Sequence, residues 1–587
     1  MTAFEDLLPP LDARFERLQR EARIPGVAWA VVRDGGLAHA AGAGTIRDGE
    51  DRRPDADAVF RIASMTKSFT AAAILLLRDE GRLGLDDPVG THVAALATWP
   101  PPTSDSTPVT IRQLLTMSSG LATDDPWGDR QQGLPLDAFE RLLAAGPPQT
   151  WPPGTTFEYS NLGYGILGRV VTNAGGQEYR EFVRDRILVP LGMASSAYRA
   201  EDVEEARLAH GYVRHDDVLI REGTDPYGAL ASMGGVFTTV GDLARWVAGF
   251  IDAFPARDDP EGPHPLRRSS RREMQQAHRL IPPVLPARMA HEPPVADVQA
   301  YGYGLVVHAD TELGTVISHG GGYPGFGSHM AWHPATGLGV IGLGNLRYAP
   351  CRPVVAEQLR ALVLADAVPR RRVAPSGDVA RYRPIVDGLL SSWDDATADG
   401  AFAMNMDLDE PRERRRAAIE RAAAELGPFH TDSERPDESY SPARLAWWLR
   451  GERGWVRLSI LVTPEPRPLV QQLVVTAVHD PSPALRTVAE RIVALATQPD
   501  PGWPSDLGAG PDLVIVTVQR SLRAAGARFG QMRLGLPTAG DGVTTATFDV
   551  DGDDGKAVLT VVVAPETGAV TALSLSAAER EAPAEAW

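Results

Sequence analysis

An internal repeat in the C-terminal part of the chain constrains its architecture more than any other feature of the sequence. The segment 454–465 (GWVRLSILVTPE) matches the segment 555–566 (GKAVLTVVVAPE), about one hundred residues later. The apolar positions that follow each segment match as well, and a helix-like stretch precedes each copy. Repetition at this period indicates that each copy is one supersecondary unit. We therefore expect two small units, each a helical segment followed by a meander of strands, over residues 378–480 and 481–587.

A linker is expected to separate these repeats from the rest of the chain. The 587 residues are enough for two to four domains. The stretch ADAVPRRRVAPSGD, near residues 366–378, is charged and contains prolines, as is typical of a linker. We predict one domain over 1–366, a linker over 367–377, and the two repeats beyond it. Their α+β pattern is similar to that of cystatin-like or nuclear-transport-factor-like domains, and neither copy contains a set of chemically reactive residues.

Residues 1–366 show strand patterns near both ends and helical patterns between them. Gly26–Val32 and Gly36–Gly44, separated by Arg33-Asp34-Gly35, predict a β-hairpin. Strand patterns return at Gly304–Val307, Val316–His319, His329–His333 and Leu338–Gly342. The sequence therefore predicts one sheet assembled from both ends of this domain.

Two other segments of this domain have weaker patterns. Residues 1–22 have apolar positions at helical spacing, and we expect Pro9-Pro10 to interrupt that helix. The stretch 254–297 is rich in proline and contains the arginine cluster 267–272. We expect it to be an irregular, exposed excursion.

Composition and charge exclude several classes of partner and site. Asp and Glu total 76 against 58 for Lys and Arg, a formal net charge of −18. Because so acidic a chain repels phosphate and anionic lipid, we expect neither nucleic-acid nor membrane partners. The single cysteine, Cys351, excludes an intrachain disulfide framework and a multi-thiolate metal site. The run Asp549-x-Asp551-x-Asp553 begins like a calcium loop but lacks the later glycine and glutamate, so a hairpin turn is the better interpretation.

The N-terminal segment and the remaining motifs predict a soluble protein without a resident cofactor. MTAFEDLLPPLD has neither the cationic start nor the apolar run of a signal peptide, so we expect a cytoplasmic location. No pattern in the sequence indicates a metal or a cofactor. The expected partner is a small-molecule or peptide substrate, with a homo-oligomer possible through the C-terminal repeats.

Lysine is almost absent from this chain, and one of the two lysines lies in a reactive pattern. The other 56 of the 58 basic residues are arginines, and the lysines are Lys67 and Lys556. Lysine can lose its proton when buried and act as a base, whereas arginine cannot. Ser64-x-x-Lys67 opens an apolar helix, so both side chains lie on one face near the helix N-terminus. This spacing predicts a serine nucleophile with a neutral amine beside it, although S-x-x-K alone also fits an N-cap serine followed by a surface lysine.

Two further motifs follow in order along the chain. Tyr159-Ser160-Asn161 lies in a turn that enters a helix, and His319-Gly320-Gly321-Gly322 ends a predicted strand. Each has a structural interpretation of its own, since Tyr-Ser-Asn is a common turn and glycines after a strand mark a bend. G-x-S-x-G, H-E-x-x-H and the phosphate-loop pattern are all absent from the sequence.

Together, S-x-x-K, Y-x-N and H-x-G resemble the serine β-lactamase and penicillin-binding-protein-like hydrolase family. The similarity is to the branch of class C β-lactamases, D-alanyl-D-alanine carboxypeptidases, D-aminopeptidases and esterases, and it covers residues 8–365. Flanking segments strengthen it: 60–64 (FRIAS), 111–121 (IRQLLTMSSGL), 158–163 (EYSNLG), 232–239 (SMGGVFTT) and 319–325 (HGGGYPG). The resemblance implies a β-lactamase/transpeptidase-like α/β (α+β) domain, with an antiparallel sheet flanked by helices and a helical subdomain.

The resemblance also implies a role for each motif residue. Ser64 would form an acyl-enzyme, and Lys67 and Tyr159 would share the base and proton-donor roles. Asn161 would hold either the substrate amide or the lysine. The backbone amides of Ser64 and Gly322 would form the oxyanion hole, and Gly321 beside Gly322 would take part in substrate binding. His319 stands where β-lactamases of this branch usually have lysine, which disfavours potent β-lactam hydrolysis.

Three functions are consistent with these residues. The first is a serine hydrolase that cleaves a D-peptide-type amide or a small ester. The second is an acyltransferase or peptide cyclase, in which an amine or alcohol replaces water at the same acyl-enzyme. The third is a catalytically degenerate homologue that only binds, and the intact Ser64, Lys67 and Tyr159 argue against it.

Overall fold

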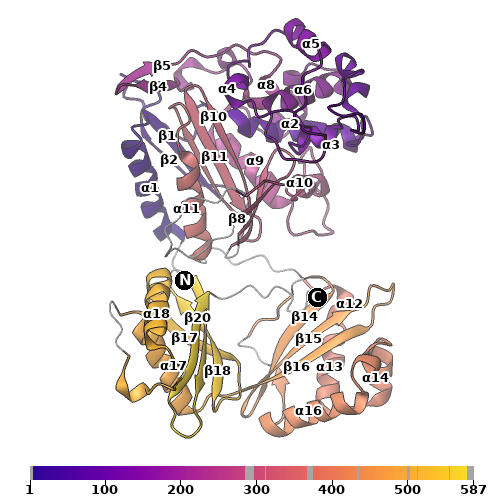
Figure 1. The fold of residues 1–587 in the computed structure, drawn as a ribbon, viewed down its shortest axis with the longest axis vertical. Helices are drawn as coiled ribbons and strands as arrows, with labels where there is room; N and C mark the ends of the chain where they lie inside the picture. Colours follow the sequence, from indigo (N-terminus) through magenta and orange to yellow (C-terminus); the bar gives the residue numbers. More distant parts are fainter. Residues whose placement is uncertain are drawn as a thin grey trace. The chain divides into compact units, whose positions relative to one another are not determined.

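The chain forms two compact units in a computed structural model, Met1–Arg370 and Arg371–Trp587. The structure describes residues 4–283, 297–310, 313–365, 374–431, 435–439, 441–498, 503–511, 513–553 and 555–577. The boundary between the units falls in the stretch expected to be a linker, part of which lies outside the described residues. Each unit is described separately (Figure 1).

An eight-stranded antiparallel sheet forms the centre of the first unit, in the order β2-β1-β12-β11-β10-β9-β8-β7. Its first hairpin pairs with its last strand, because β1 runs antiparallel to β12. This arrangement confirms the predicted sheet built from both ends of the domain. The strands are β1 (Gly26–Arg33), β2 (Gly36–Gly44), β7 (Arg279–Leu280), β8 (Asp297–Tyr301), β9 (Val306–Asp310), β10 (Gly314–Tyr323), β11 (Phe326–His333) and β12 (Leu338–Gly344).

Alternating side chains of β1 divide the first unit into two cores. Val27, Trp29 and Val31 join a core on one face, beneath helices α1 (Phe4–Glu21) and α11 (Cys351–Leu364). The residues between them, such as Ala28 and Ala30, join a larger core on the other face. Because successive strand residues point to opposite faces, a strand buried on both sides has a continuous apolar sequence, as GVAWAVV does.

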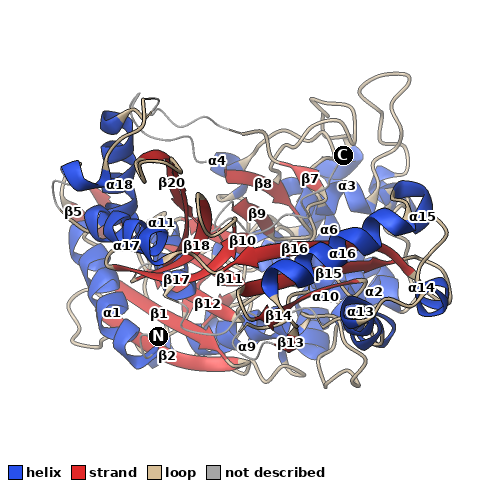
Figure 2. Cartoon of the chain, turned by 90° about the horizontal axis from the view of Figure 1, so that it is seen from below, coloured by secondary structure: helices blue, strands red, loops and turns tan. Residues whose placement is uncertain are grey.

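Helices cover the second face of this sheet and form the helical subdomain (Figures 1 and 2). Helix α2 is buried over most of its length and packs against α6 and α8. No helix among the described residues is long and apolar enough to cross a membrane. The helices are α2 (Thr66–Asp79), α3 (Ile111–Leu115), α4 (Asp125–Gly128), α5 (Leu136–Ala144), α6 (Asn161–Gly175), α7 (Tyr179–Val183), α8 (Ala231–Gly234), α9 (Val240–Asp252) and α10 (Arg268–Met274).

The structure corrects one expectation for this unit and limits another. Helix α1 continues through Pro9-Pro10, although each proline removes one backbone hydrogen bond, because its apolar face is buried at Phe4, Leu11 and Phe15. The stretch 254–297 is irregular before α10 and exposed over residues 255–263, as expected, and residues 284–296 lie outside the described residues. Its arginine cluster, in contrast, lies largely in α10, in which Arg271 is buried and its guanidinium lies 3.2 Å from a carboxylate oxygen of Asp252.

The second unit contains the two repeats as two four-stranded antiparallel sheets. Each sheet has the same hairpin, Gly451↔Gly454 in one and Gly552↔Gly555 in the other, and the same late bulge between its last two strands. The first sheet consists of β13 (His430–Thr431), β14 (Arg444–Gly451), β15 (Gly454–Val462) and β16 (Val470–His479). The second consists of β17 (Met532–Ala539), β18 (Thr545–Gly552), β19 (Gly555–Val563) and β20 (Val570–Ala577).

Each repeat also has its own helices and its own core. Helices α12 (Gly377–Ala380), α13 (Tyr382–Ser391), α14 (Asp395–Ala401), α15 (Met406–Asp409) and α16 (Arg412–Leu426) accompany the first sheet, and α17 (Pro483–Ala496) and α18 (Ile515–Phe529) accompany the second. Residues from Val379 to Val470 form one core, and residues from Leu485 to Leu575 form the other. The repeat seen in the sequence is therefore a repeat of complete α+β units.

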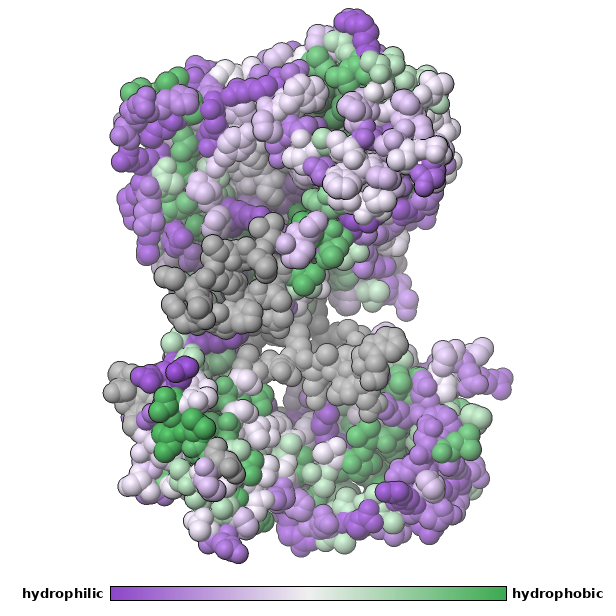
Figure 3. Space-filling model, viewed as in Figure 1, coloured by the Kyte–Doolittle hydropathy of each residue, from purple (hydrophilic) through white to green (hydrophobic). Residues whose placement is uncertain are grey.

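Polar and apolar residues are mixed over the visible surface of both units, without one continuous apolar face (Figure 3). This mixture is typical of a folded surface, on which scattered apolar side chains are normal. The arrangement of polar residues in the interior is therefore more informative about function than the surface.

Candidate active site

Ser64 lies in a tight turn between a short strand and helix α2. The turn is a 3-10 helix, η1 (Ala63–Met65), and the preceding strand is β3 (Phe60–Arg61). Ala63 has a φ of 49°, a left-handed conformation that is uncommon for a residue with a side chain. Strained backbone of this kind is often found at functional sites.

Lys67 lies one turn further along and is fully buried. Its Nζ donates hydrogen bonds to Ser64 Oγ at 2.9 Å, Asn161 Oδ1 at 2.7 Å and the Met233 carbonyl at 2.9 Å. Three acceptors match the three protons of an ammonium group. The pairing of Ser64 with Lys67 that the spacing predicts is thus present in the structure.

Burial lowers the pKa of Lys67 from 10.5 to about 8, and the charges of Asp125, Asp129 and Asp124 oppose this shift. Desolvation disfavours the charged form of an amine, so it dominates over the nearby carboxylates. At pH 7, roughly a tenth of the molecules then have a neutral Lys67. A neutral amine within hydrogen-bond distance of a serine hydroxyl can accept its proton.

Asn161 begins helix α6 and orients the lysine. Its Oδ1 accepts from Lys67, and its Nδ2 donates to Asp125 Oδ1 at 2.7 Å. The carboxylate of Asp124 accepts the backbone N–H groups of Asn161 and Leu162 at 2.6 and 2.8 Å, which satisfies two donors at the helix N-terminus. The side chain of Asn161 therefore has a fixed orientation.

Tyr159 lies beside both Ser64 and Lys67. Lys67 Nζ is 4.9 Å from the centroid of the Tyr159 ring. Burial raises the pKa of the Tyr159 phenol well above 10, the charge of Asp125 adds to this shift, and a hydrogen bond with Ser64 opposes it. The phenol is therefore protonated at neutral pH and can donate a hydrogen bond, but it is a poor base in the resting site.

His319 lies in β10 and is neutral. It is 4% exposed, and burial is the main reason that its pKa is lowered from 6.5 to about 3. Its Nδ1 lies 2.6 Å from the Gly320 carbonyl, and its Nε2 lies 3.0 Å from the Tyr301 hydroxyl. Because a carbonyl can only accept, Nδ1 carries the proton and Nε2 accepts from Tyr301. His319 thus cannot supply a positive charge to a substrate at neutral pH.

The glycines after His319 allow close approach of neighbouring groups. A Cβ atom at Gly321 would lie 2.1 Å from the carbonyl oxygen of Ile62, in the segment that leads into Ser64. A Cβ atom at Gly322 would lie 2.3 Å from the ring of Tyr348. Any side chain at either position would displace β10 from the serine turn or from Tyr348, which accounts for the glycine run.

Most of the residues singled out in the sequence converge on one pocket of about 290 Å³, although Gly321 does not line it. The lining combines residues from three predicted motifs with others that the sequence did not indicate: Ser64, Asp125, Asp129, Tyr159, His319, Gly320, Gly322 and Tyr348. Lys67 and Asn161 lie behind it, bonded to one another. The roles of these residues stay predictions, but their convergence is a property of the structure.

The sequence did not identify Asp125, Asp129 and Tyr348 as site residues. The two aspartates belong to an acidic stretch, Asp124-Asp125-Pro126-Trp127-Gly128-Asp129, that resembles an ordinary solvated loop. Nothing in its spacing relates it to Ser64. Tyr348 follows the last strand of the sheet, where a lone tyrosine has no distinguishing pattern.

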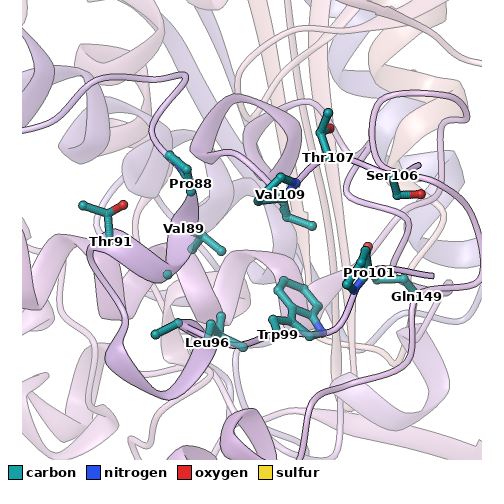
Figure 4. A pocket seen from close by; sticks show the side chains of 13 residues that line it. Pro88, Val89, Thr91, Leu96, Trp99, Pro101, Ser106, Thr107, Val109 and Gln149 are labelled. Carbon is teal, nitrogen blue, oxygen red and sulfur yellow. The ribbon is translucent and has the colours of Figure 1, made fainter. Parts of the chain in front are cut away.

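A second cavity, of about 340 Å³, lies elsewhere in the helical part of the first unit (Figure 4). Most of its lining is apolar or proline, including Val89, Leu96, Trp99 and Val109, and its polar side chains are those of Thr91, Ser106, Thr107 and Gln149. It has no titratable side chain that could act as an acid or a base. Among the described residues, no group of three or more His, Cys, Asp or Glu side chains is placed to hold a metal ion.

Comparison with known proteins gives consistent matches. Residues 11–365 match the beta-lactamase family. The D-alanyl-D-alanine-carboxypeptidase/endopeptidase AmpH of Escherichia coli K12 is 28% identical over 331 residues, which cover 54% of this chain and 78% of AmpH. Penicillin-binding protein 4 of Amycolatopsis lactamdurans is 31% identical over 274 residues, which cover 45% of this chain and 68% of that protein.

A solved structure shares the fold over nearly the whole chain. The octameric penicillin-binding protein homologue from Pyrococcus abyssi has a TM-score of 0.51 at 18% identity, and the match covers 95% of this chain and 96% of that one. At this identity the similarity concerns the fold alone. It extends beyond residue 365, where the family match ends.

Proposed function

Since the chain belongs to the beta-lactamase family, we propose that it is a serine hydrolase in which Ser64 forms an acyl-enzyme with a small amide or ester. The observation that carries this proposal is the 2.9 Å hydrogen bond between Ser64 Oγ and a buried Lys67. A lysine that only formed a structural ion pair would be expected to have a carboxylate partner. The three hydrogen-bond acceptors of Lys67 are instead a hydroxyl, an amide oxygen and a backbone carbonyl.

The first chemical step is the transfer of the Ser64 proton to Lys67. The oxygen of Ser64 then attacks the substrate carbonyl carbon, and the carbonyl oxygen becomes an oxyanion. The amide groups of Ser64 and Gly322, residues that line the same pocket, are proposed to donate hydrogen bonds to this oxyanion. Each such donor is worth on the order of a 10²–10³ factor in rate.

The second step is collapse of this intermediate, in which the leaving group departs with a proton. Tyr159 is suited to relay that proton, since its phenol is protonated and is hydrogen-bonded to Ser64. Lys67, now charged, is the ultimate donor. A water molecule then attacks the acyl-enzyme, and the same groups run the proton transfers in reverse. This assignment makes Lys67 the base, a choice that the sequence left open between Lys67 and Tyr159.

Labelling of Ser64 tests the proposal directly. Intact-protein mass spectrometry with a fluorophosphonate and a panel of β-lactams should show one covalent adduct on wild-type protein and none on Ser64→Ala. Ser68→Ala is the matched control, because Ser68 lies one turn away and donates its hydroxyl to the Met65 carbonyl. Absence of a fluorophosphonate adduct on wild-type protein would contradict the proposal.

Acyl transfer to an amine or alcohol is the second candidate, and it uses the same acyl-enzyme. Product analysis with and without an added amine separates it from hydrolysis. A D-peptide-type amide is the substrate suggested by AmpH, whose name describes a D-alanyl-D-alanine-carboxypeptidase/endopeptidase. A cytoplasmic location and a homo-oligomer formed through the second unit remain predictions, to be tested by cell fractionation and sedimentation.

A further inference from the structure

The pocket beside Ser64 contains two carboxylates and no positively charged side chain. Asp125 and Asp129 both line it, and its other titratable residues are His319 and two tyrosines. Resting on the proposed function of Ser64, we propose that this pocket selects substrates with a protonated amine near the scissile carbonyl. Asp129 is the main group that binds the amine, and Asp125 supports it.

Asp129 is a buried carboxylate without a cationic partner. It is 4% exposed, and the Tyr348 hydroxyl donates to its Oδ2 at 2.6 Å. In the part of the chain that the structure describes, no Lys, Arg or His nitrogen lies within 4.0 Å of the Asp129 carboxylate. Aspartates are almost never fully buried unless they are paired. Burial raises the pKa of Asp129 from 3.8 to about 6, so the group is largely charged at pH 7 and above. An ammonium group bound in the pocket would supply the missing partner.

Lys67 and Arg61, the two cations whose charges lower the pKa of Asp129, cannot take this place. Lys67 donates to three acceptors, none of them Asp129. The guanidinium of Arg61 lies 3.6 Å from the centroid of the Tyr323 ring and donates to the Gly234 carbonyl, and Arg61 does not line the pocket. Its charge reaches Asp129 only at longer range.

Asp125 adds a second negative charge at the same pocket. Its Oδ1 accepts from Asn161, and no ion pair of this carboxylate is found among the described residues. A substrate carboxylate entering here would face two like charges, while the charge of Lys67 is already shared among its three hydrogen-bond acceptors. His319 is neutral and hydrogen-bonded through both ring nitrogens, so it does not compensate. The pocket therefore disfavours anions as well as favouring cations.

Two pairs of substrates, each differing in one charge, test the proposal on the full-length protein. D-alanine p-nitroanilide and propionic acid p-nitroanilide differ by an amine on the acyl part. Acetylcholine and 3,3-dimethylbutyl acetate have the same shape and differ by a cation on the alcohol part. In at least one pair, we expect kcat/KM to be at least tenfold higher for the cationic member. The pair that shows the preference identifies the side of the scissile bond that the carboxylates face.

Substitution of Asp129 links that preference to the carboxylate. In Asp129→Asn, which can still accept from Tyr348, the cationic-to-neutral ratio of kcat/KM should fall at least fivefold. Asp137→Asn is the control, because Asp137 is an exposed carboxylate on α5 paired with Arg141, and it should leave the ratio unchanged. If Asp129→Asn fails to fold, the wild-type protein can be labelled with a fluorophosphonate in the presence of benzylammonium or of benzyl alcohol. Stronger protection of Ser64 by benzylammonium would show the preference for a cation.

The outcomes separate this inference from the proposed function. Ser64 labelled by a fluorophosphonate, with no cation preference in either pair, overturns the inference alone. A preference that persists in Asp129→Asn overturns the assignment to Asp129. Failure of Ser64 to be labelled overturns the proposed function instead.

Discussion

The two units of this chain bury very different polar groups. In the first unit, five of the buried polar side chains gather at one pocket, namely Ser64, Lys67, Asp129, Asn161 and His319, while others, such as Arg268 and Arg271, lie elsewhere. In the described part of the second unit, the buried polar side chains are Arg415 and Arg435. Arg415 donates to the carbonyls of Met406 and Glu410, and Arg435 donates to the carbonyl of Pro537.

This difference distinguishes a reactive interior from a structural one. Arginine keeps its charge when buried, so it can join distant parts of the backbone without changing protonation state. Lysine, aspartate and histidine change their pKa when buried, and Lys67, Asp129 and His319 all do so. Perturbed pKa values cluster at functional sites. The first unit therefore contains the candidate active site, and we expect the second unit to act as a scaffold.

The largest expected effect comes from removing the nucleophile or its base. Ser64→Ala should abolish turnover, and Lys67→Arg should reduce kcat/KM by three orders of magnitude or more although it keeps a positive charge. A guanidinium cannot accept the serine proton, and removal of a nucleophile or its base usually costs several orders of magnitude. Steady-state kinetics on a p-nitrophenyl ester would measure this. A Lys67→Arg enzyme with more than roughly a tenth of wild-type activity would contradict the base assignment.

The next effect concerns Tyr159. Tyr159→Phe removes only the phenolic oxygen and should lower kcat about 10²-fold, the usual range for a lost proton-transfer group. Circular dichroism should show a normal fold, since the ring contact with Tyr301 at 6.3 Å does not involve the hydroxyl. Tyr212→Phe is a matched control, since this tyrosine bonds the backbone of Asp48 and does not line the pocket. Unchanged kcat in Tyr159→Phe would mean that Tyr159 is only a turn residue.

The pH dependence of Ser64 labelling should follow the titration of Lys67. Below its pKa of about 8, the neutral fraction of Lys67 rises about tenfold per pH unit. The rate of fluorophosphonate labelling should therefore rise from pH 6 to 8 and level off above that. A plateau reached below pH 7, or a further rise near pH 10, would indicate that a group other than Lys67 is the base.

The sequence predicted the elements with strong local patterns and the residues in short motifs. The hairpin of β1 and β2 was predicted to within one residue of its bounds, because two strand-like runs separated by a tight turn are a local signal. Ser64 and Lys67 were found from their helical spacing and from the scarcity of lysine. The continuous helix α1 was missed, because the packing that outweighs the cost of Pro9-Pro10 is tertiary.

The acidic side of the pocket was not predictable for the same reason. Asp129 and Tyr348 are separated by more than two hundred residues, and their hydrogen bond exists only once β12 lies in the sheet. A charged loop in sequence is usually solvated, and only the fold shows that Asp129 is buried. The burial of the arginines in α10 and in the second unit was missed for the same reason, because it too depends on the fold.

A smaller effect, confined to the second unit, should follow from Arg435→Ala. The guanidinium of Arg435 lies 4.1 and 4.4 Å from the ring centroids of Trp448 and Trp455, in the first repeat, and donates to Pro537 in the second. Loss of these contacts should lower the free energy of unfolding of this unit by about 2–4 kcal/mol. Urea denaturation followed by tryptophan fluorescence would measure the change.

The exposed Arg520 of α18 supplies the control for that measurement. Arg520→Ala should change the free energy of unfolding by less than about 0.5 kcal/mol. Neither variant should change the rate of Ser64 labelling. A slower labelling rate in Arg435→Ala would mean that the second unit takes part in the chemistry, and the contrast between the two units would fail.

The smallest expected effect is that of deleting the second unit. Among the described residues, the three apolar clusters of the first unit draw on residues from Phe4 to Leu364 and on none beyond. The three clusters of the second unit draw on none before Val379. A chain ending at Arg370 should therefore fold, and its Ser64 should be labelled by a small fluorophosphonate within twofold of the full-length rate. Sedimentation of both chains would show at the same time whether the second unit drives assembly. If the shortened chain is insoluble, the two units depend on each other for folding. If it is soluble but unlabelled, the second unit is needed to form the reactive serine site, and the description of that unit as a scaffold would be wrong.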